Sequence, residues 1–169
     1  MSDKIKDTKP VFRGLSWYRE QYFSFYIPTD WQKVAWPDER VGIIYVPTPG
    51  DDHTLFAVQV VDIGTKVTAD DLPYLSMGFL DGIKQLPNRK IEFKDESVTG
   101  SLVQLEAKYT FLEHGQQRKR WVRVLYHETR QITATAQGKT EETYHYWLPM
   151  FFETMMTLKV HSIKPTIPG

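Results

Sequence analysis

The sequence contains no cysteine, which excludes disulfide bonds, thiolate catalysis, zinc ribbons and iron–sulfur clusters. Its 21 basic and 21 acidic residues cancel, so no overall field steers the chain onto nucleic acid or an anionic membrane. No apolar run approaches the roughly 20 residues of a membrane-spanning helix. The motifs of nucleotide-binding loops, α/β-hydrolase nucleophiles and HExxH metalloproteases are also missing. We therefore expect a protein that is not an enzyme and has no cofactor, no nucleic-acid partner and no membrane span.

The length and composition fit one folded domain. The chain has 169 residues, of which 41% are apolar, an ordinary share for a globular protein. Residues 1–15 are expected to form a polar leader or linker, and residues 16–160 a single domain. Residues 161–169 carry two prolines and a glycine, which predicts a tail.

The first half of the domain shows three strand-like segments followed by a helix. In residues 22–27, Phe23, Phe25 and Ile27 alternate with other side chains, which is the period of a strand. Residues 41–46 and 55–61 are further apolar segments separated by a loop with turn residues. Residues 71–86 change to helical spacing, and Pro73 favours a helix start near Asp71.

The second half predicts more strands and a last helix. Residues 91–93 form a short run, and residues 103–111 and 122–126 alternate on either side of a glycine-containing turn, which is typical of a hairpin. Residues 131–137 put small side chains on one face, which leaves room for a helix. Thr140 is a good N-cap for that helix, and Pro149 predicts a kink or a break in it. The order, roughly β-β-β-α-β-β-β-α, predicts an α+β fold with helices packed on an antiparallel sheet.

Three segments of the chain have a distinctive order of side chains: the opening strand FSFYIPTDW, the apolar strand VGIIYVP and the closing TLKV after an aromatic helix. Together they resemble the Mog–PsbP-like superfamily. The resemblance covers residues 20–160. It implies an α/β/α sandwich and a non-catalytic role as a partner of larger assemblies. It does not transfer any functional residue to a position in this chain.

A basic stretch in the predicted hairpin is the first candidate site. Four residues make up this predicted protein-binding patch: Arg118, Arg120, Trp121 and Arg123. Arginine and tryptophan are favoured at interface hot spots. Strand alternation places Trp121 and Arg123 on one face and the two other arginines on the opposite face. Cross-strand ion pairs with Glu106 and Glu113 are an alternative explanation of the same charges.

Two other groups of polar residues are weaker candidates. Asp51, Asp52 and His53 could ligate a metal, but aspartate beside glycine is ordinary turn chemistry, and we predict no metal site. His127 and Glu128 could act as an acid–base pair. Neighbours in a strand point to opposite faces, so a strand end entering a turn is the preferred interpretation.

The sequence therefore favours an accessory domain that docks on a protein partner. The alternative is a small-molecule carrier with a pocket between the sheet and the last helix. A carrier should show an apolar cavity there, whereas a docking domain should show a filled core and an exposed aromatic–basic surface. An enzyme should show titratable groups that converge in a cleft.

Overall fold

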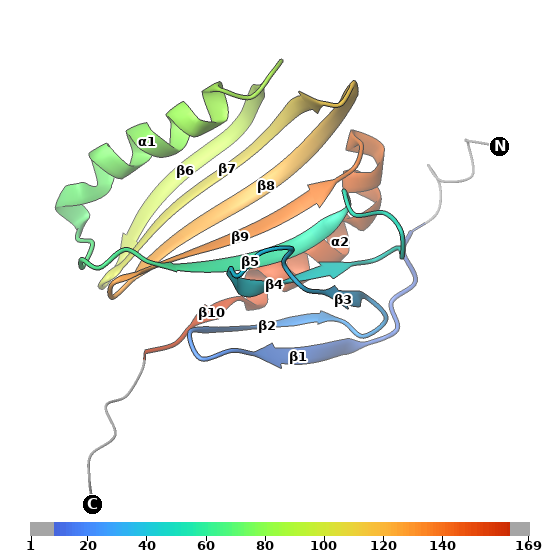
Figure 1. The fold of residues 1–169 in the computed structure, drawn as a ribbon, viewed down its shortest axis with the longest axis horizontal. Helices are drawn as coiled ribbons and strands as arrows, with labels where there is room; N and C mark the ends of the chain where they lie inside the picture. Colours follow the sequence, from blue (N-terminus) through green and yellow to red (C-terminus); the bar gives the residue numbers. More distant parts are fainter. Residues whose placement is uncertain (1–8, 163–169) are drawn as a thin grey trace, which may run out of the picture.

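The computed structural model describes residues 9–162 and shows an α+β fold. Over that range the chain forms ten strands and two α-helices, and a short 3₁₀ turn precedes the first helix. Five strands come before the first helix, four lie between the helices and one follows the second helix (Figure 1). Within residues 9–162, neither helix is long and apolar enough to cross a membrane.

The strands form two antiparallel sheets. The large sheet has seven strands in the order β3-β4-β5-β9-β8-β7-β6, and the small sheet has the order β1-β2-β10. The strands are β1 (Leu15–Arg19), β2 (Phe23–Pro28), β3 (Gln32–Val34), β4 (Val41–Val46), β5 (Leu55–Asp62), β6 (Lys90–Thr99), β7 (Leu102–Glu113), β8 (Gln116–His127), β9 (Arg130–Gly138) and β10 (Lys159–Val160). The helices are α1 (Leu72–Lys84) and α2 (Glu141–Thr157), with the 3₁₀ turn η2 (Ala69–Asp71) before α1.

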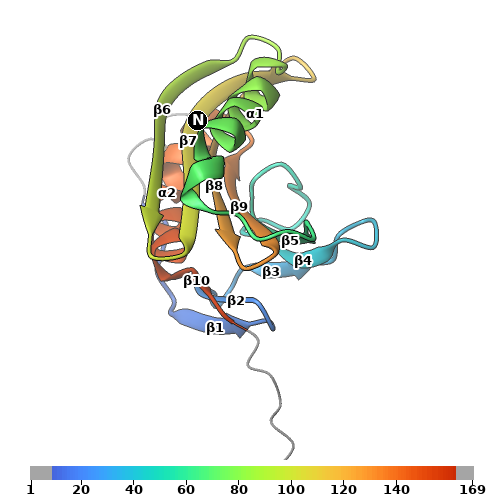
Figure 2. The same cartoon turned by 90° about the vertical axis from the view of Figure 1, so that its left-hand side faces the viewer.

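The helices lie on opposite sides of the large sheet. Figure 2 shows α1 on one side and α2 on the other, with the small sheet below α2. One apolar core lies under α1 and is built largely from β7 and β8. A second core lies between the large sheet, α2 and the small sheet, and contains most of the buried aromatic side chains. The arrangement confirms the predicted α/β/α sandwich with an antiparallel sheet.

Alternating side chains explain the long central strands. Along β7, Val103, Leu105 and Ala107 are buried in the core under α1, and the residues between them are only half-buried. The predicted hairpin is confirmed, because β7 pairs with β8 from Glu113 opposite Gln116 to Val103 opposite Tyr126. This pairing fixes which side chains of the two strands share a face.

The helix starts follow the predicted capping residues. α1 begins at Leu72 with Pro73 in its first turn, and the backbone N–H of Thr68 donates to Asp71 Oδ2 at 2.9 Å. At α2, the Thr140 hydroxyl oxygen accepts from the backbone N–H of Thr143 at 3.1 Å. These contacts satisfy donors that a helix N-terminus leaves unpaired.

Of the two alternatives predicted at Pro149, the break is wrong, because α2 is one continuous helix from Glu141 to Thr157, and the kink stays a prediction. A proline in a helix removes the hydrogen bond to the carbonyl four residues earlier, here that of His145. Both Pro149 and His145 are exposed, so water can donate to the carbonyl instead.

The structure has more strands than the predicted order. The short strands β1, β3 and β10 were not predicted, and residues 91–93 belong to the longer strand β6, Lys90–Thr99. β6 is an edge of the large sheet, and all its residues but Ile91 are exposed. Five charged side chains interrupt its alternation, as is common for edge strands. The opening strand β2 lies in the small sheet, away from the other predicted strands.

Candidate docking surface

The basic stretch on β8 divides between the two faces of the sheet, as alternation predicts. Arg118 and Arg120 lie on the α1 side, opposite Phe111 and Tyr109 of β7. Arg118 is buried, and its Nε lies 3.1 Å from Glu113 Oε1, so the predicted cross-strand ion pair forms. Arg120 donates from Nε and Nη2 to the side-chain oxygen of Gln137, at 2.9 and 2.6 Å. Both guanidinium groups therefore have partners within the sheet.

Trp121 and Arg123 lie on the α2 side, where they join the sheet to the helix. Trp121 is only 2% exposed, and its indole N–H donates to Glu106 Oε2 at 2.7 Å. Arg123 donates to the carbonyl of Met155 in α2 at 2.5 Å and to the side chain of Gln104 at 2.8 Å. Burial lowers the pKa of Arg123, and the charge of Glu106 acts in the opposite direction. A direct contact of these four side chains with a partner stays a prediction.

A row of side chains crosses the α2 side of the sheet at the level of Trp121. In register, Phe93 of β6 lies opposite Lys108 of β7, Lys108 opposite Trp121 of β8, and Trp121 opposite Ala136 of β9. A bulge in β6 between Ile91 and Phe93 sets this register. Paired residues point to the same side of a sheet, so the row forms one continuous strip.

The helix α2 covers only one end of this row. It packs on β9, where the small Ala136 is fully buried, and on β8. Phe152 of α2 stacks on Trp121, with ring centroids 6.5 Å apart. Beyond the helix, Phe93 is 44% exposed, and Phe152 itself is 52% exposed. We call Phe93, Lys108, Trp121 and Phe152 the aromatic shelf.

A lysine lies between the rings of the shelf. The ammonium nitrogen of Lys108 is 5.4 Å from the ring centroid of Phe93 and 4.6 Å from that of Trp121. Both distances lie within the range of cation–π attraction. Among residues 9–162, no carboxylate lies within ion-pair distance of Lys108. The shelf thus presents two exposed rings and a cation that pairs with no carboxylate of the described part of the chain.

Sequence reasoning did not identify Phe93, Lys108 or Phe152 as site residues. Phe152 falls outside the buried stripe of the last helix, which includes Tyr144 and Phe151. An aromatic residue on the exposed side of a helix can indicate a binding surface, and this signal could have identified Phe152. Phe93 gave no comparable signal, because its opposition to Lys108 depends on the bulge in β6.

The loop of Asp51, Asp52 and His53 is a turn in which the side chain of Asp51 accepts hydrogen bonds from the backbone. Asp51 Oδ1 accepts from the backbone N–H of His53 at 3.0 Å and from that of Thr54 at 3.2 Å. Within residues 9–162, no three potential metal-ligating side chains of histidine, aspartate or glutamate gather in one place. The geometry agrees with ordinary turn chemistry.

Replacing Asp51 with alanine is expected to lower the free energy of unfolding by about 1 kcal/mol, because both backbone donors lose their acceptor. Asp51→Asn should retain most of the stability, since its amide oxygen can accept the same bonds. Thermal unfolding with and without added divalent cation checks both variants. A metal-dependent rise in melting temperature that Asp51→Asn abolishes would show that the loop binds a metal instead.

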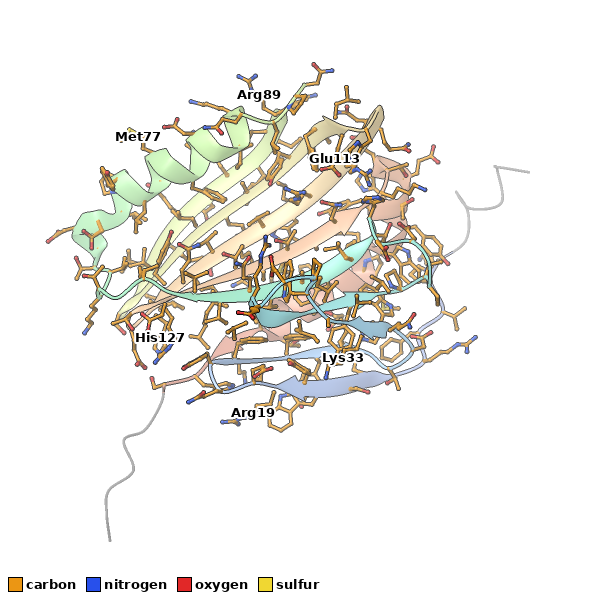
Figure 3. All side chains as sticks on the ribbon, in the orientation of Figure 1. Arg19, Lys33, Met77, Arg89, Glu113 and His127 are labelled. Atoms are coloured by element: carbon orange, nitrogen blue, oxygen red, sulfur yellow. The ribbon has the colours of Figure 1, made fainter. Side chains whose placement is uncertain are left out.

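His127 and Glu128 contact each other, contrary to the expectation from strand alternation. His127 Nε2 lies 3.3 Å from Glu128 Oε1 and 3.0 Å from the hydroxyl of Ser162. The chain turns at Glu128, whose φ of 55° is left-handed, and this turn brings the two side chains together. The preferred interpretation of a strand end entering a turn agrees with this geometry. Hydrogen bonds from Ser162 and Arg130 lower the pKa of Glu128. Glu113 and His127 mark the opposite ends of the hairpin region (Figure 3).

The space between the large sheet and α2 is filled. Side chains without exposed surface from three elements meet there, among them Phe25, Phe56 and Phe151. The ring of Phe25 packs edge-on against Phe56 at 5.1 Å. A hollow of 450 Å³ lined by Pro149 lies between α2 and residues 9–15, not between α2 and the sheet.

Comparisons with known proteins give similar folds and little sequence identity. No protein-family model matches the chain, and no curated protein matches it. Cyanobacterial PsbP from Synechocystis has a TM-score of 0.62 and 15% identity, over 92% of this chain and 99% of that one. LpqN of Mycobacterium tuberculosis, described as involved in cell envelope biogenesis, has a TM-score of 0.57 and 14% identity, over 96% and 97% of the two chains. The Ran-binding protein Mog1p of Saccharomyces cerevisiae has a TM-score of 0.50 and 10% identity, over 82% and 89%. The chain has the Mog/PsbP-like fold that these structures share.

Proposed function

We propose that this protein is a non-catalytic domain that docks on a protein partner through the aromatic shelf. The exposed rings of Phe93 and Phe152, on either side of Lys108, carry the proposal. Aromatic residues are enriched at the centres of protein interfaces and supply much of the binding energy at hot spots. A partner that covered this strip would remove apolar surface from water and would supply an acceptor for Lys108.

The fixed positions of Trp121 and Phe152 in the shelf support the same proposal. Trp121 is fixed by its hydrogen bond to Glu106, and Phe152 is held against it by α2. Side chains that are already ordered lose little conformational entropy on binding, which favours affinity. The Ran-binding yeast protein supports the proposal in a general way, because it shows that a protein with this fold can bind another protein.

The interior of the protein argues against the two other classes of function. Among residues 9–162, the fully buried side chains of Phe25, Phe56 and Phe151 pack together at the place where a carrier pocket was predicted. Among residues 9–162, burial is the first cause of most of the shifted pKa values, including those of Tyr18 and Tyr45, whose ring centroids lie 5.9 Å apart. Burial, for example, raises the pKa values of Tyr45 and Tyr126, which lie in different cores. Apart from Tyr18 and Tyr45, the shifted groups of the described residues lie in different parts of the fold, whereas a catalytic site gathers such groups in one cleft.

The shelf predicts that alanine at Phe93 and Phe152 together removes partner binding while the fold remains. Both side chains are about half exposed, so we expect the double variant to lose little stability. A pull-down from lysate of the source cell, followed by mass spectrometry, should recover a stoichiometric protein with the unaltered chain and not with the double variant.

Tyr74→Ala is the matched control. Tyr74 is 77% exposed on α1, on the opposite side of the large sheet, and its replacement should leave recovery unchanged. Equal recovery with the double variant and the unaltered chain would refute the shelf as the docking surface. A co-purified small molecule without any protein partner would favour the carrier alternative.

A further inference from the structure

The small sheet presents a second surface that the proposed function does not use. Along β2, Phe23, Phe25 and Ile27 point into the core beside α2. Alternation therefore turns Ser24 and Tyr26 to the other face of the sheet. Their paired residues share that face, which lies below α2 in Figure 2. We call Trp17, Arg19, Tyr26 and Lys159 the outer face of the small sheet.

Two aromatic rings on this outer face are open to solvent. Trp17 of β1 lies directly opposite Tyr26 of β2, and the side chains are 55% and 44% exposed. The guanidinium of Arg19 lies 5.7 Å from the ring centroid of Trp17. Paired exposed rings of this size are a common feature of binding surfaces.

Two cations, Arg19 and Lys159, lie on this outer face beside the rings. Arg19 and Lys159 both lie opposite Ser24, one from each neighbouring strand. Neither has a carboxylate within ion-pair distance among residues 9–162. Next to them, His161 Nε2 and the Ser24 hydroxyl lie 2.7 Å apart. Burial lowers the pKa of His161, and the charges of Arg19 and Lys159 lower it further.

We propose that the outer face of the small sheet binds an acidic segment of a partner protein. Carboxylates of the segment would pair with Arg19 and Lys159, and its apolar side chains would cover Trp17 and Tyr26. The inference goes beyond the proposed function, because it concerns another surface and a partner of defined charge. It stands whether or not the aromatic shelf also binds a protein.

The number of cations favours a protein partner over a membrane or a nucleic acid. A basic residue near an anionic membrane contributes about 1 kcal/mol, so Arg19 and Lys159 alone would bind a membrane weakly. Nucleic acid is bound by a track of phosphate contacts, which two cations do not make. An acidic peptide needs only a few charges together with apolar contacts of the kind that Trp17 and Tyr26 offer.

Nuclear magnetic resonance can test the proposal with a synthetic probe. The probe is a short peptide of alternating glutamate and leucine, and its glutamine counterpart is the neutral control. The chain has five tryptophans and thus five indole N–H signals, of which Trp17→Phe identifies the signal of Trp17. We expect the acidic peptide to shift the Trp17 signal at low salt, and the shift to shrink at high salt. The glutamine peptide should produce little change.

Two variants separate the cations of this surface from cations elsewhere. Arg19→Gln with Lys159→Gln should weaken peptide binding about fivefold, as expected for the loss of two exposed ion pairs. Arg89→Gln is the matched control, because Arg89 is exposed at the opposite end of the molecule from Arg19 (Figure 3). The Phe93 and Phe152 double variant should bind the peptide normally, so a failure of the aromatic shelf would be distinguishable.

Several results would overturn the proposal. These are the absence of a Trp17 shift up to millimolar peptide, equal shifts with the glutamine peptide, or unchanged affinity in the Arg19 and Lys159 variant. A larger Trp17 shift with vesicles that contain phosphatidylserine, or with single-stranded oligothymidine, would replace the acidic segment by a membrane or a nucleic acid.

Discussion

Trp121→Ala is expected to lower the free energy of unfolding by about 3–5 kcal/mol, the cost typical of removing a large buried aromatic side chain. The side chain is 2% exposed and packs between β7, β9 and Phe152. Its removal also leaves Glu106 without the indole donor at 2.7 Å. In a domain of this size, each kcal/mol lowers the melting temperature by about 2–4 °C, so we expect a drop of about 10 °C.

Trp121→Phe is the matched variant for this experiment. It keeps an aromatic ring against Phe152 and Lys108 but loses the hydrogen bond to Glu106, so it should cost less than alanine. Equilibrium unfolding in denaturant measures both variants. An alanine variant as stable as the unaltered chain would contradict the position of Trp121 in the core.

Because Trp121→Ala is expected to destabilise the domain, this variant cannot by itself test whether Trp121 contacts a partner. A partner lost from this variant could be lost because the surface has changed or because the domain has unfolded. The exposed residues Phe93 and Phe152 avoid that ambiguity, since their truncation leaves the core intact. Arg123 carries the same difficulty as Trp121, because it bonds the carbonyl of Met155 at the end of α2.

Local patterns predicted the long elements well. The alternation of β7, β8 and β9 identified the central strands and the faces of their side chains. Pro73 and Thr140 marked the starts of both helices to within a residue or two. These predictions succeeded because sheet alternation and helix capping are determined by neighbours in the sequence.

The short strands could not be predicted in the same way. β3 has three residues and β10 has two, which is too few for any alternation to appear. β10 exists because the chain after α2 passes the edge of β2, where Lys159 pairs with Ser24. The separation of β2 from the large sheet likewise depends on long-range pairing, not on the sequence of FSFYIP itself.

The candidate site shows the same division between local and long-range information. Alternation placed Trp121 and Arg118 on opposite faces of β8, and the structure agrees. It could not say that both would be buried, because burial depends on what α1, α2 and the neighbouring strands place over them. The shelf residues Phe93 and Phe152 are 59 positions apart in the numbering, and only the fold brings them to the same strip.

Gly138→Ala is expected to destabilise the protein by about 3 kcal/mol, near the upper end of the usual cost of overpacking. Gly138 ends β9, and α2 begins three residues later at Glu141. A Cβ atom there would lie 2.4 Å from the backbone nitrogen of Tyr144 and 2.6 Å from its Cα. Those atoms belong to the helix backbone, so the clash cannot be relieved by rotating a side chain.

The close approach at Gly138 explains why the cost should be large. Tyr144 is 1% exposed, and its ring packs against Phe151 at 5.7 Å. A helix pushed away from Gly138 would pull both rings out of the core that α2 shares with the sheet. The small side chains of β9 were expected to leave room for a helix, and at Gly138 the backbone of α2 comes so close to β9 that a Cβ atom does not fit.

Gly82→Ala is the control that separates this contact from the general effect of replacing glycine. Gly82 lies in α1, and a Cβ there would meet no atom within 4 Å. Alanine is the better helix former by about 1 kcal/mol, so this variant should be at least as stable as the unaltered chain. Thermal unfolding measures both variants. If the contact with Tyr144 is what destabilises Gly138→Ala, the melting temperature should fall in Gly138→Ala and should stay the same or rise in Gly82→Ala. A Gly138→Ala variant with a melting temperature equal to or higher than that of the unaltered chain would mean that α2 can move away from β9 without loss of stability. The close contact at Gly138 would then not be needed for the packing of the helix.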